Sequence, residues 1–226
     1  ITEQDFATIM LVTLVLGLGI LLIAFRAVVA AVIPLVLAVG AIFTATAAAA
    51  IVSQVYPLSD SYSEMILLMG MAVGIDYSLF IVSRFRAERK SGKPKLDAIA
   101  VASNTTGKAV MYAGITVVLS LTGLMLTDNP IFISLSLAAV IVVLITMLGS
   151  LTLLPALLSA LGDNVNRLRL PFIGRERSAE GSGVWSVITD KVLARPAVFA
   201  AVTAPALVAL ALPVASLNLG FNGGSS

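Results

Sequence analysis

The sequence predicts an all-α protein, a polytopic bundle of transmembrane helices, and three observations lead to this prediction. Of the 226 residues, 59% are hydrophobic and only 12% are charged, whereas a soluble domain carries about 45–50% apolar and about 25% charged residues. The mean hydropathy is +1.06. Six apolar stretches have the length of about 20 residues that a helix needs to cross a bilayer. A chain with so few charges cannot cover a water-soluble core, so a soluble enzyme is excluded.

The six predicted spans follow one another with short connections on the outer side. The first span lacks the basic start and the cleavage site of a signal peptide. A tight turn at Arg26 precedes the second span, and the outer loops carry the Pro, Asn and Asp residues that are typical of turns. In chain order, the spans cover residues 6–25, 27–52, 63–82, 109–127, 131–161 and 196–216.

Two longer loops are expected on the inner side. Within about residues 83–108, Pro94 can start a helix whose uneven apolar face, beside basic residues, suits the headgroup interface of a membrane. A solvated connector is the alternative for this loop. Residues 162–195 are polar and are interpreted as a cytoplasmic linker. The predicted organisation is therefore a first bundle of five spans over residues 1–161, the linker, and a sixth span.

The charged residues give the bundle an orientation. All 14 Lys and Arg residues lie in three of the predicted loops. The charged residues of the loops on the alternate side are all acidic, namely Glu3, Asp5, Asp60, Glu64 and Asp128. Basic loops stay on the cytoplasmic side of a membrane, so both ends of the chain are predicted to lie on the outer side.

Two missing residue types narrow the chemistry. The chain has no cysteine and no histidine, which excludes disulfides, cysteine-ligated metals, a thiol nucleophile and an imidazole base. The net charge of +2 is too small for a nucleic-acid binder. We therefore expect no catalytic residue, no metal site and no nucleic-acid partner, and we do not expect an enzyme.

Asp76 is the one carboxylate or basic group that lies away from the ends of the six predicted spans. Along a helix it lies about 18 Å from Glu64 and about 12 Å from Arg84, which is near the middle of a hydrocarbon core about 30 Å thick. A charge there costs at least about 2.5–3.5 kcal/mol. We expect Asp76 to face the bundle interior and to be neutral part of the time, as a proton carrier must be. The alternative is a protonated Asp that only holds two helices together.

Several residues around Asp76 can be interpreted as functional or as purely structural. The hydroxyl of Tyr77 can donate to a carboxylate on a facing helix, or its ring simply packs. Gly70 and Gly74 form a small-residue ridge on the face of Tyr77 and let another backbone approach closely. Thr116 and Ser120 are possible supporting hydroxyls near Asp76, although bonding to their own backbone is the plainer interpretation.

A basic cluster follows the span that carries Asp76. It either anchors the topology or also binds anionic lipid headgroups, at roughly 1 kcal/mol for each basic residue. Its members are Arg84, Arg86, Arg89 and Lys90.

The run GMAVGIDYSLFIVSRFRAER, residues 70–89, resembles the signature of the MMPL (mycobacterial membrane protein large) family. This family belongs to the resistance–nodulation–division (RND) superfamily of transporters. AFRAVVAAVIPL, GKAVMYAGITVVLS and TLLPALL are supporting stretches, so the resemblance covers essentially the whole chain. It implies an RND/MMPL-like half-bundle in which residues 196–216 are the first helix of a second half. Residues 217–226 would begin a second outer domain, and we interpret the chain, which starts at Ile1 without Met, as a fragment.

The resemblance also implies a role for Asp76 and Tyr77. They match the family's Asp-Tyr pair on its fourth helix and would form half of a proton relay. The other half, with its own Asp-Tyr pair, is the expected partner and is absent from this chain. Some members carry a serine on the fifth helix that faces the pair. The matching residue here is Ala113, so that role is not carried over.

The function that the resemblance implies is export of lipids or other hydrophobic cell-envelope components across the bacterial inner membrane. The proton gradient would supply the energy, with no other cofactor. Membrane lipids and a lipidic substrate are expected partners, and a homo-oligomer or accessory envelope proteins are left open.

A lipid sensor or scaffold that does not transport, built on the same bundle as in sterol-sensing domains, is the alternative function. An intramembrane aspartyl protease is disfavoured, because it needs two aspartates within the membrane.

Overall fold

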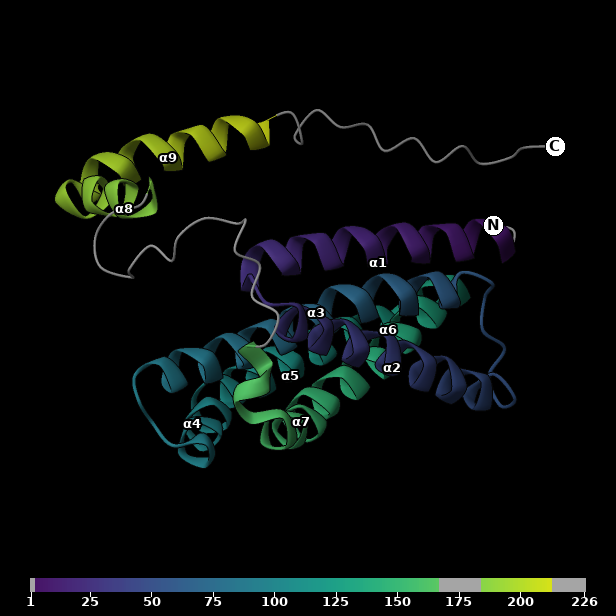
Figure 1. Cartoon of the computed structure of the whole chain (residues 1–226). Coiled ribbons are helices and arrows are strands. Elements are labelled where there is room, and N and C mark those ends of the chain that lie inside the picture. The colour runs from purple at the N-terminus through teal and green to yellow at the C-terminus, as the bar shows by residue number, and fades with distance from the viewer. Residues whose placement is uncertain (1–2, 167–183, 213–226) are drawn as a thin grey trace. The chain divides into compact units, whose positions relative to one another are not determined.

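The computed structural model describes residues 3–166 and 184–212, and every regular element of these residues is helical (Figure 1). The chain divides into two compact units, Ile1–Ile173 and Gly174–Ser226. The first unit contains the bundle, and the described part of the second contains two helices. The predicted all-α class is confirmed for the described residues.

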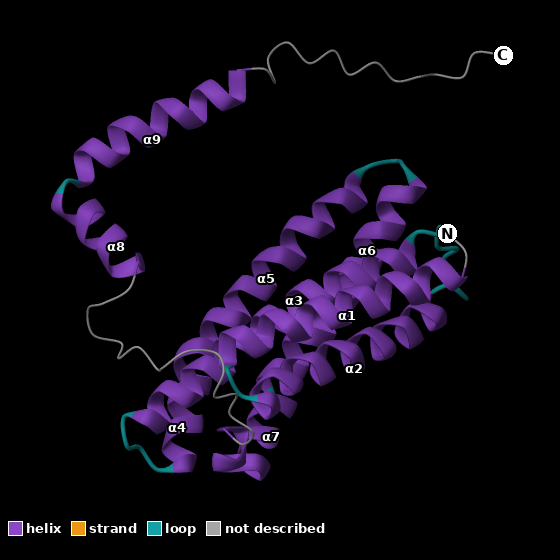
Figure 2. Cartoon of the chain, turned by 45° about the horizontal axis from the view of Figure 1, so that its top comes forward, coloured by secondary structure: helices purple, strands orange, loops and turns teal. Residues whose placement is uncertain are grey.

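Five long helices form the first unit, and α3 lies at its centre (Figure 2). Helix α3 packs mainly on α2 and α6, while α1 packs on α2 and α5 packs on α6. Their bounds are α1 Glu3–Phe25, α2 Val28–Val52, α3 Tyr62–Lys90, α5 Lys108–Thr122 and α6 Pro130–Leu151.

Local sequence explains the sharp ends of two helices. Arg26 has a φ of 52°, a left-handed conformation that reverses the chain between α1 and α2 within two residues. At the start of α6, the Asn129 side chain accepts a hydrogen bond of 2.9 Å from the backbone N–H of Ile131. Pro130 then occupies the first turn, where its missing N–H is not needed.

The inner loop predicted over residues 83–108 is more helical than expected. Helix α3 continues to Lys90, and the short helix α4, Lys95–Ala102, leads through a π-turn at Ser103–Gly107 straight into α5. A 3₁₀ turn, η2 at Gly123–Leu126, ends α5, so Lys95–Leu126 reads as one helix of 32 residues. The basic side chains did not end α3, because Lys and Arg are good helix formers that favour a helix C-terminus.

The predicted span over residues 131–161 is broken near its C-terminal end. Helix α6 ends at Leu151, Thr152 has φ −117° and ψ −62°, and α7 runs over Leu153–Leu161. Pro155 has no N–H for the Leu151 carbonyl, which explains a break at this point. A 3₁₀ turn, η3 at Gly162–Asn166, follows α7 and occupies the start of the predicted linker.

Among the described residues, four helices are long and apolar enough to cross a membrane: Val28–Val52, Tyr62–Lys90, Lys95–Leu126 and Pro130–Val165. In the second unit, α8 (Val184–Ala194) and α9 (Pro196–Ala211) bend by 97° at Arg195 and count as a fifth span only if taken together. The apolar part of α1, Leu11–Phe25, is shorter. The protein is thus a multi-pass membrane protein with four to five candidate spans. The predicted total of six membrane spans is not confirmed.

The second unit departs from the prediction in one respect. Helix α8 lies within residues 162–195, which were predicted to be a linker. The end of the predicted sixth span and the predicted segment 217–226 lie outside the described residues.

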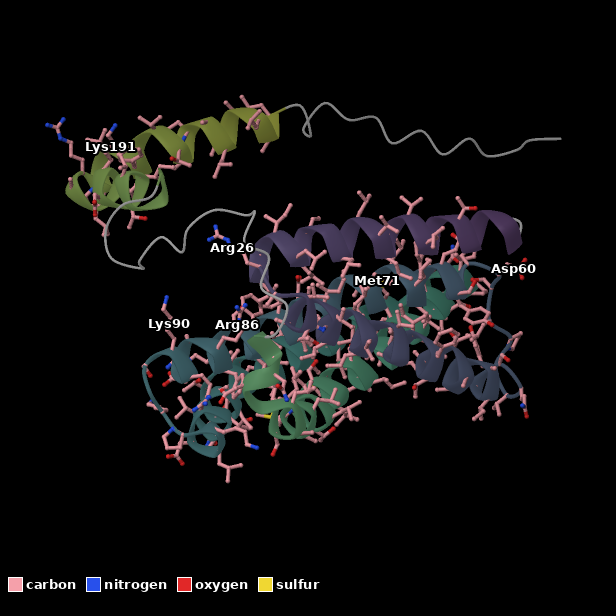
Figure 3. The ribbon with its side chains drawn as sticks, viewed as in Figure 1. Arg26, Asp60, Met71, Arg86, Lys90 and Lys191 are labelled. Atoms are coloured by element: carbon pink, nitrogen blue, oxygen red, sulfur yellow. The ribbon has the colours of Figure 1, made fainter. Side chains whose placement is uncertain are left out.

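Charged side chains mark the two ends of the bundle. Arg26, Arg86 and Lys90 lie at one end of the first unit and Asp60 lies at the other, with Met71 between them (Figure 3). This separation follows the charge pattern of the sequence.

Candidate functional site

Helix α3 holds Asp76 and Tyr77 near its middle. Glu64 lies in its first turn and Arg89 and Lys90 in its last turn, where each charge opposes the helix dipole. With 29 residues, α3 has a length of about 43 Å, longer than a hydrocarbon core of about 30 Å. Its charged ends can therefore lie outside the core while Asp76 stays inside.

Asp76 is exposed in this structure, and it lines an open groove between α1 and α3. The groove has a volume of about 460 Å³ and is almost entirely apolar. The structure gives Asp76 no hydrogen bond and no ion pair among the described residues. The residues that line the groove are Thr13, Leu16, Gly17, Ile20, Leu21, Leu67, Leu68, Met71, Ala72, Ile75, Asp76 and Leu79.

The expectation that Asp76 faces the interior of this bundle is wrong. The face of α3 that meets α2 and α6 is occupied by Gly70, Gly74 and Ser78, and a residue at position 76 lies about 200° around the helix from position 74. Asp76 therefore points away from that contact. An uncovered carboxylate at this depth is costly, so this face of α3 is suited to being covered by another element.

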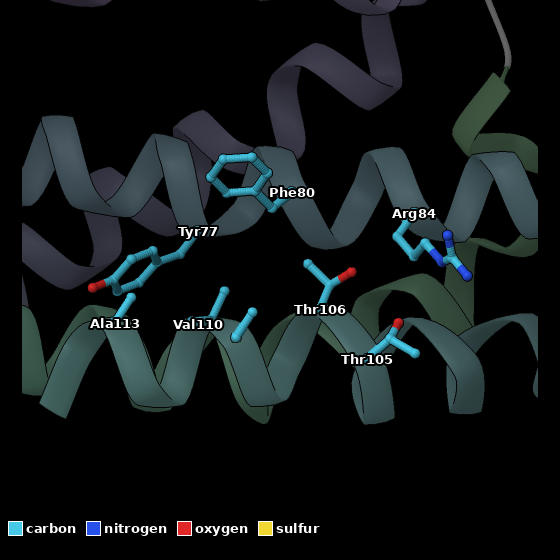
Figure 4. A pocket seen from close by; sticks show the side chains of 8 residues that line it. Tyr77, Phe80, Arg84, Thr105, Thr106, Val110 and Ala113 are labelled. Atoms are coloured by element: carbon cyan, nitrogen blue, oxygen red, sulfur yellow. The ribbon is translucent and has the colours of Figure 1, made fainter. Parts of the chain in front are cut away.

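Tyr77 is buried, with 8% of its surface exposed, and it lines a second groove on a different side of α3. This groove lies between α3 and α5 and has a volume of about 450 Å³ (Figure 4). Arg84 lies at one end, and the Tyr77 hydroxyl lies near Ala113 at the other. Phe80, Thr105, Thr106, Ala109 and Val110 line the rest.

The neighbours of the Tyr77 hydroxyl are small. A methyl group placed on Gly114 would lie 3.5 Å from this hydroxyl, and 2.6 Å from the sulfur of Met147. Ala113 lies in the same groove and offers no hydroxyl. Tyr77 and Asp76 thus line separate grooves, one between α3 and α5 and the other between α1 and α3.

Gly70 and Gly74 lie where α3 meets its two neighbours most closely. A Cβ atom on Gly70 would lie 2.5 Å from a side-chain carbon of Ile42 in α2. A Cβ atom on Gly74 would lie 2.9 Å from the backbone Cα of Ala38. Because glycine has no side chain, α2 and α3 can pack this closely, and the contact fixes the position of the part of α3 that carries Asp76.

The two hydroxyls on α5 do not line the groove of Asp76. Thr116 and Ser120 are both exposed, and the Thr116 hydroxyl donates to the Tyr112 carbonyl at 2.9 Å. Helix α5 packs on α6, whereas the Asp76 groove is formed with α1. In the described bundle, these hydroxyls have no contact that would support Asp76.

The basic cluster makes contacts within the protein. Arg84 pairs with Glu88 at 2.7 Å. Arg86 lies over the ring of Phe25, 5.4 Å from its centre, in a cation–π contact. Arg89 donates to the Asp163 carboxylate in η3 and, at 2.6 Å, to the Lys93 carbonyl. Lys90 is exposed.

The sequence analysis did not identify the two acidic residues that pair with this basic cluster, Glu88 and Asp163. Glu88 is 7% exposed and lies between Arg84 and Lys93, whose ammonium group is 2.6 Å from its carboxylate. Asp163 joins α3 to the end of α7 across 74 positions of sequence. The Arg84–Glu88 spacing of four residues was a local signal, whereas nothing local pointed to Asp163.

We expect the two acids to differ in their effect on stability. Glu88→Ala should lower the midpoint of thermal unfolding by roughly twice as much as Asp163→Ala or more, because it removes a buried carboxylate that pairs with both Arg84 and Lys93, whereas Asp163 is exposed. The effect of Asp163→Ala should vanish in 0.5 M salt, since its carboxylate is 73% exposed. Thermal unfolding of the full-length protein in detergent checks both. Equal losses that salt leaves unchanged would contradict this assignment.

Among the described residues, no group of three or more acidic, His or Cys side chains is placed to hold a metal ion.

Comparison with known proteins gives consistent matches. The sequence model of the MMPL family matches residues 1–199. The "Mycolic acid-containing lipids exporter MmpL11" of Mycolicibacterium smegmatis is 34% identical over 97% of this chain and 23% of its own length. The "Heme uptake protein MmpL11" of Mycobacterium tuberculosis is 32% identical over 97% of this chain and 23% of its own. The "Trehalose monomycolate exporter MmpL3" of the same species is 30% identical over 73% of this chain. The chain spans about a fifth to a quarter of these relatives.

Proposed function

Because the chain belongs to the MMPL family, we propose that it is part of an exporter of lipids or other hydrophobic cell-envelope components, driven by the proton gradient. Two of the similar proteins are named as exporters of mycolic acid lipids or trehalose monomycolate. Another is named for heme uptake. All three cargoes are hydrophobic or amphiphilic, which supports a hydrophobic substrate. The parts of the protein beyond this chain would select the particular substrate.

The observation that carries the proposal is the uncovered carboxylate at mid-span. Asp76 has no partner among the described residues and opens into an apolar groove. Since a charged group in hydrocarbon is costly, intramembrane carboxylates usually mark ion or proton pathways. Protonation removes most of that cost, so Asp76 can alternate between a charged and a neutral form as its surroundings change.

Asp76 and Tyr77 form half of the proposed relay. The relatives are about four times longer than this chain, and their remaining length has room for a second bundle. That bundle would cover Asp76 and bring a carboxylate to the Tyr77 hydroxyl. The glycine contacts of α3 support this arrangement, because they hold the relay helix against α2 at the same depth. No cofactor other than the proton gradient enters the proposal.

The proposed topology keeps six spans in the bacterial inner membrane. Helix α1 and the region of α9 supply the first and the sixth, and both ends of the chain lie on the outer face. The separation of Arg26, Arg86 and Lys90 from Asp60 supports this orientation (Figure 3). The basic cluster then anchors α3 at the inner face, beside anionic lipid headgroups.

Collapse of the proton gradient separates this function from that of a sensor or scaffold. Full-length protein in vesicles with an imposed gradient should export a fluorescent lipid, and an uncoupler should reduce export to the level of protein-free vesicles. One proton that crosses about 150 mV supplies roughly 3.5 kcal/mol, so no other energy source is needed. Lipid binding that persists with the uncoupler, without any gradient-dependent export, would favour the sensor.

A further inference from the structure

The buried face of α3 carries a hydroxyl that has no partner. Ser78 is fully buried, and its Oγ makes no hydrogen bond in the structure. A buried hydroxyl usually finds an acceptor, because an unpaired polar group in an apolar core is costly. Serine in a helix commonly donates to a carbonyl of the preceding turn, as Ser134 does to Pro130 at 2.8 Å. Ser78 does not do so.

The contacts of the two glycines show what lies opposite Ser78. Gly70 meets Ile42 of α2 and Val142 of α6, and Gly74, one turn later, meets Ala38 and Thr146. One turn further along α3, the contacting residue therefore lies four positions earlier in α2 and four positions later in α6. Continued for one more turn, this step predicts that Ser78 lies at the level of Pro34 and Ser150.

All three side chains at this level are inside the core. Pro34 is less than 2% exposed, and Ser150 is 2% exposed. Pro34 lies inside α2 and has no N–H, so the carbonyl of Ala30 lacks the donor that a regular helix would supply. Ala30 is itself fully buried. In membrane helices, ordered water and Ser or Thr side chains satisfy the carbonyls that proline sets free.

We infer that a single buried water molecule lies between α2, α3 and α6, held by the Ser78 hydroxyl, the Ala30 carbonyl and the Ser150 hydroxyl. Three partners is the usual number for a buried water. The site would pair the Ser78 hydroxyl, which has no partner in the structure, with a carbonyl of α2 that Pro34 deprives of its regular helical donor. It couples the helix of Asp76 and Tyr77 to α2 by a polar bridge on the side away from the Asp76 groove.

A double-mutant cycle on the full-length protein tests the bridge. Ser78→Ala should lower the midpoint of thermal unfolding by roughly 3 °C or more. In a Pro34→Ala background, where residue 34 regains its N–H, the same change should cost less than half as much. Ser136→Ala is the matched control. Ser136 is also fully buried, but its hydroxyl donates directly to the Leu121 carbonyl, so its cost should be equal in both backgrounds.

The outcomes distinguish a hydrated site from a dry one. A midpoint that Ser78→Ala leaves unchanged or raises would overturn the inference, because the loss of an unsatisfied hydroxyl costs nothing. An equal loss in both backgrounds would overturn the link to Ala30. A cryo-EM map that resolves ordered waters should show a peak about 2.7–3.0 Å from both the Ser78 Oγ and the Ala30 oxygen. A direct bond between these atoms, or an empty space, would exclude the water. None of these readouts depends on transport.

Discussion

Asp76→Asn in the full-length protein is expected to abolish proton-driven export, down to the level of protein-free vesicles. Asparagine has nearly the same shape as aspartate but neither binds nor releases a proton at physiological pH. The groove around position 76 is almost entirely apolar, so no neighbouring side chain can take over this role. Lipid export and proton flux should fall together, measured in the same vesicles with a lipid probe and a pH-sensitive dye.

Two controls show whether the loss is specific. Asp128→Asn removes an exposed carboxylate from the short turn before α6 and should leave export near the wild-type rate. The thermal midpoint of Asp76→Asn should equal or exceed that of the wild type, because the variant no longer places a charge at mid-membrane. Wild-type export by Asp76→Asn would refute the proton-carrier role. Loss of export with intact gradient-dependent proton flux would mean that Asp76 acts on the cargo instead.

The sequence located Asp76 but could not give its direction. A lone carboxylate far from both ends of an apolar run is visible in any single sequence. Which side of α3 it occupies depends on which side α2 and α6 cover, and the hydrophobic pattern of α3 does not tell these apart, because lipid and protein neighbours are equally apolar. The glycine pair was a better guide, since only a close helix contact requires two residues without side chains one turn apart.

Two other features of the structure were not predicted because they depend on residues that are distant in sequence. The Arg89–Asp163 pair joins α3 to η3, and the Ser78 hydroxyl is notable only because the packing of the helices buries it without a partner. The join of α4 to α5 was missed for a different reason. Residues 103–107 are polar and were not predicted to continue a helix, yet a π-helical turn keeps this segment helical and joins α4 to α5.

Gly74→Val is expected to have the second largest effect, by moving α2 away from α3. The nearest obstacles to a side chain at this position are the Cα atom of Ala38 at 2.9 Å and its Cβ at 3.0 Å. Backbone cannot yield as a flexible side chain can, so the whole of α2 must shift. Overpacking of this kind costs about 1–3 kcal/mol. Because position 74 lies two residues from Asp76, the shift should also displace the carboxylate and reduce export several-fold.

Two other glycines separate this steric effect from the general effect of valine in a helix. Gly40 of α2 has nothing within 4 Å of a would-be Cβ atom, so Gly40→Val should leave the thermal midpoint nearly unchanged. Gly70→Ala should fall between the two, because its nearest obstacle is the movable side chain of Ile42. Thermal unfolding in detergent should therefore rank the midpoints as Gly40→Val, then Gly70→Ala, then Gly74→Val. If Gly74→Val unfolds at the wild-type temperature, the close approach of α2 does not hold α3 in position. The depth of Asp76 would then have to be fixed by contacts other than the one between Gly74 and α2.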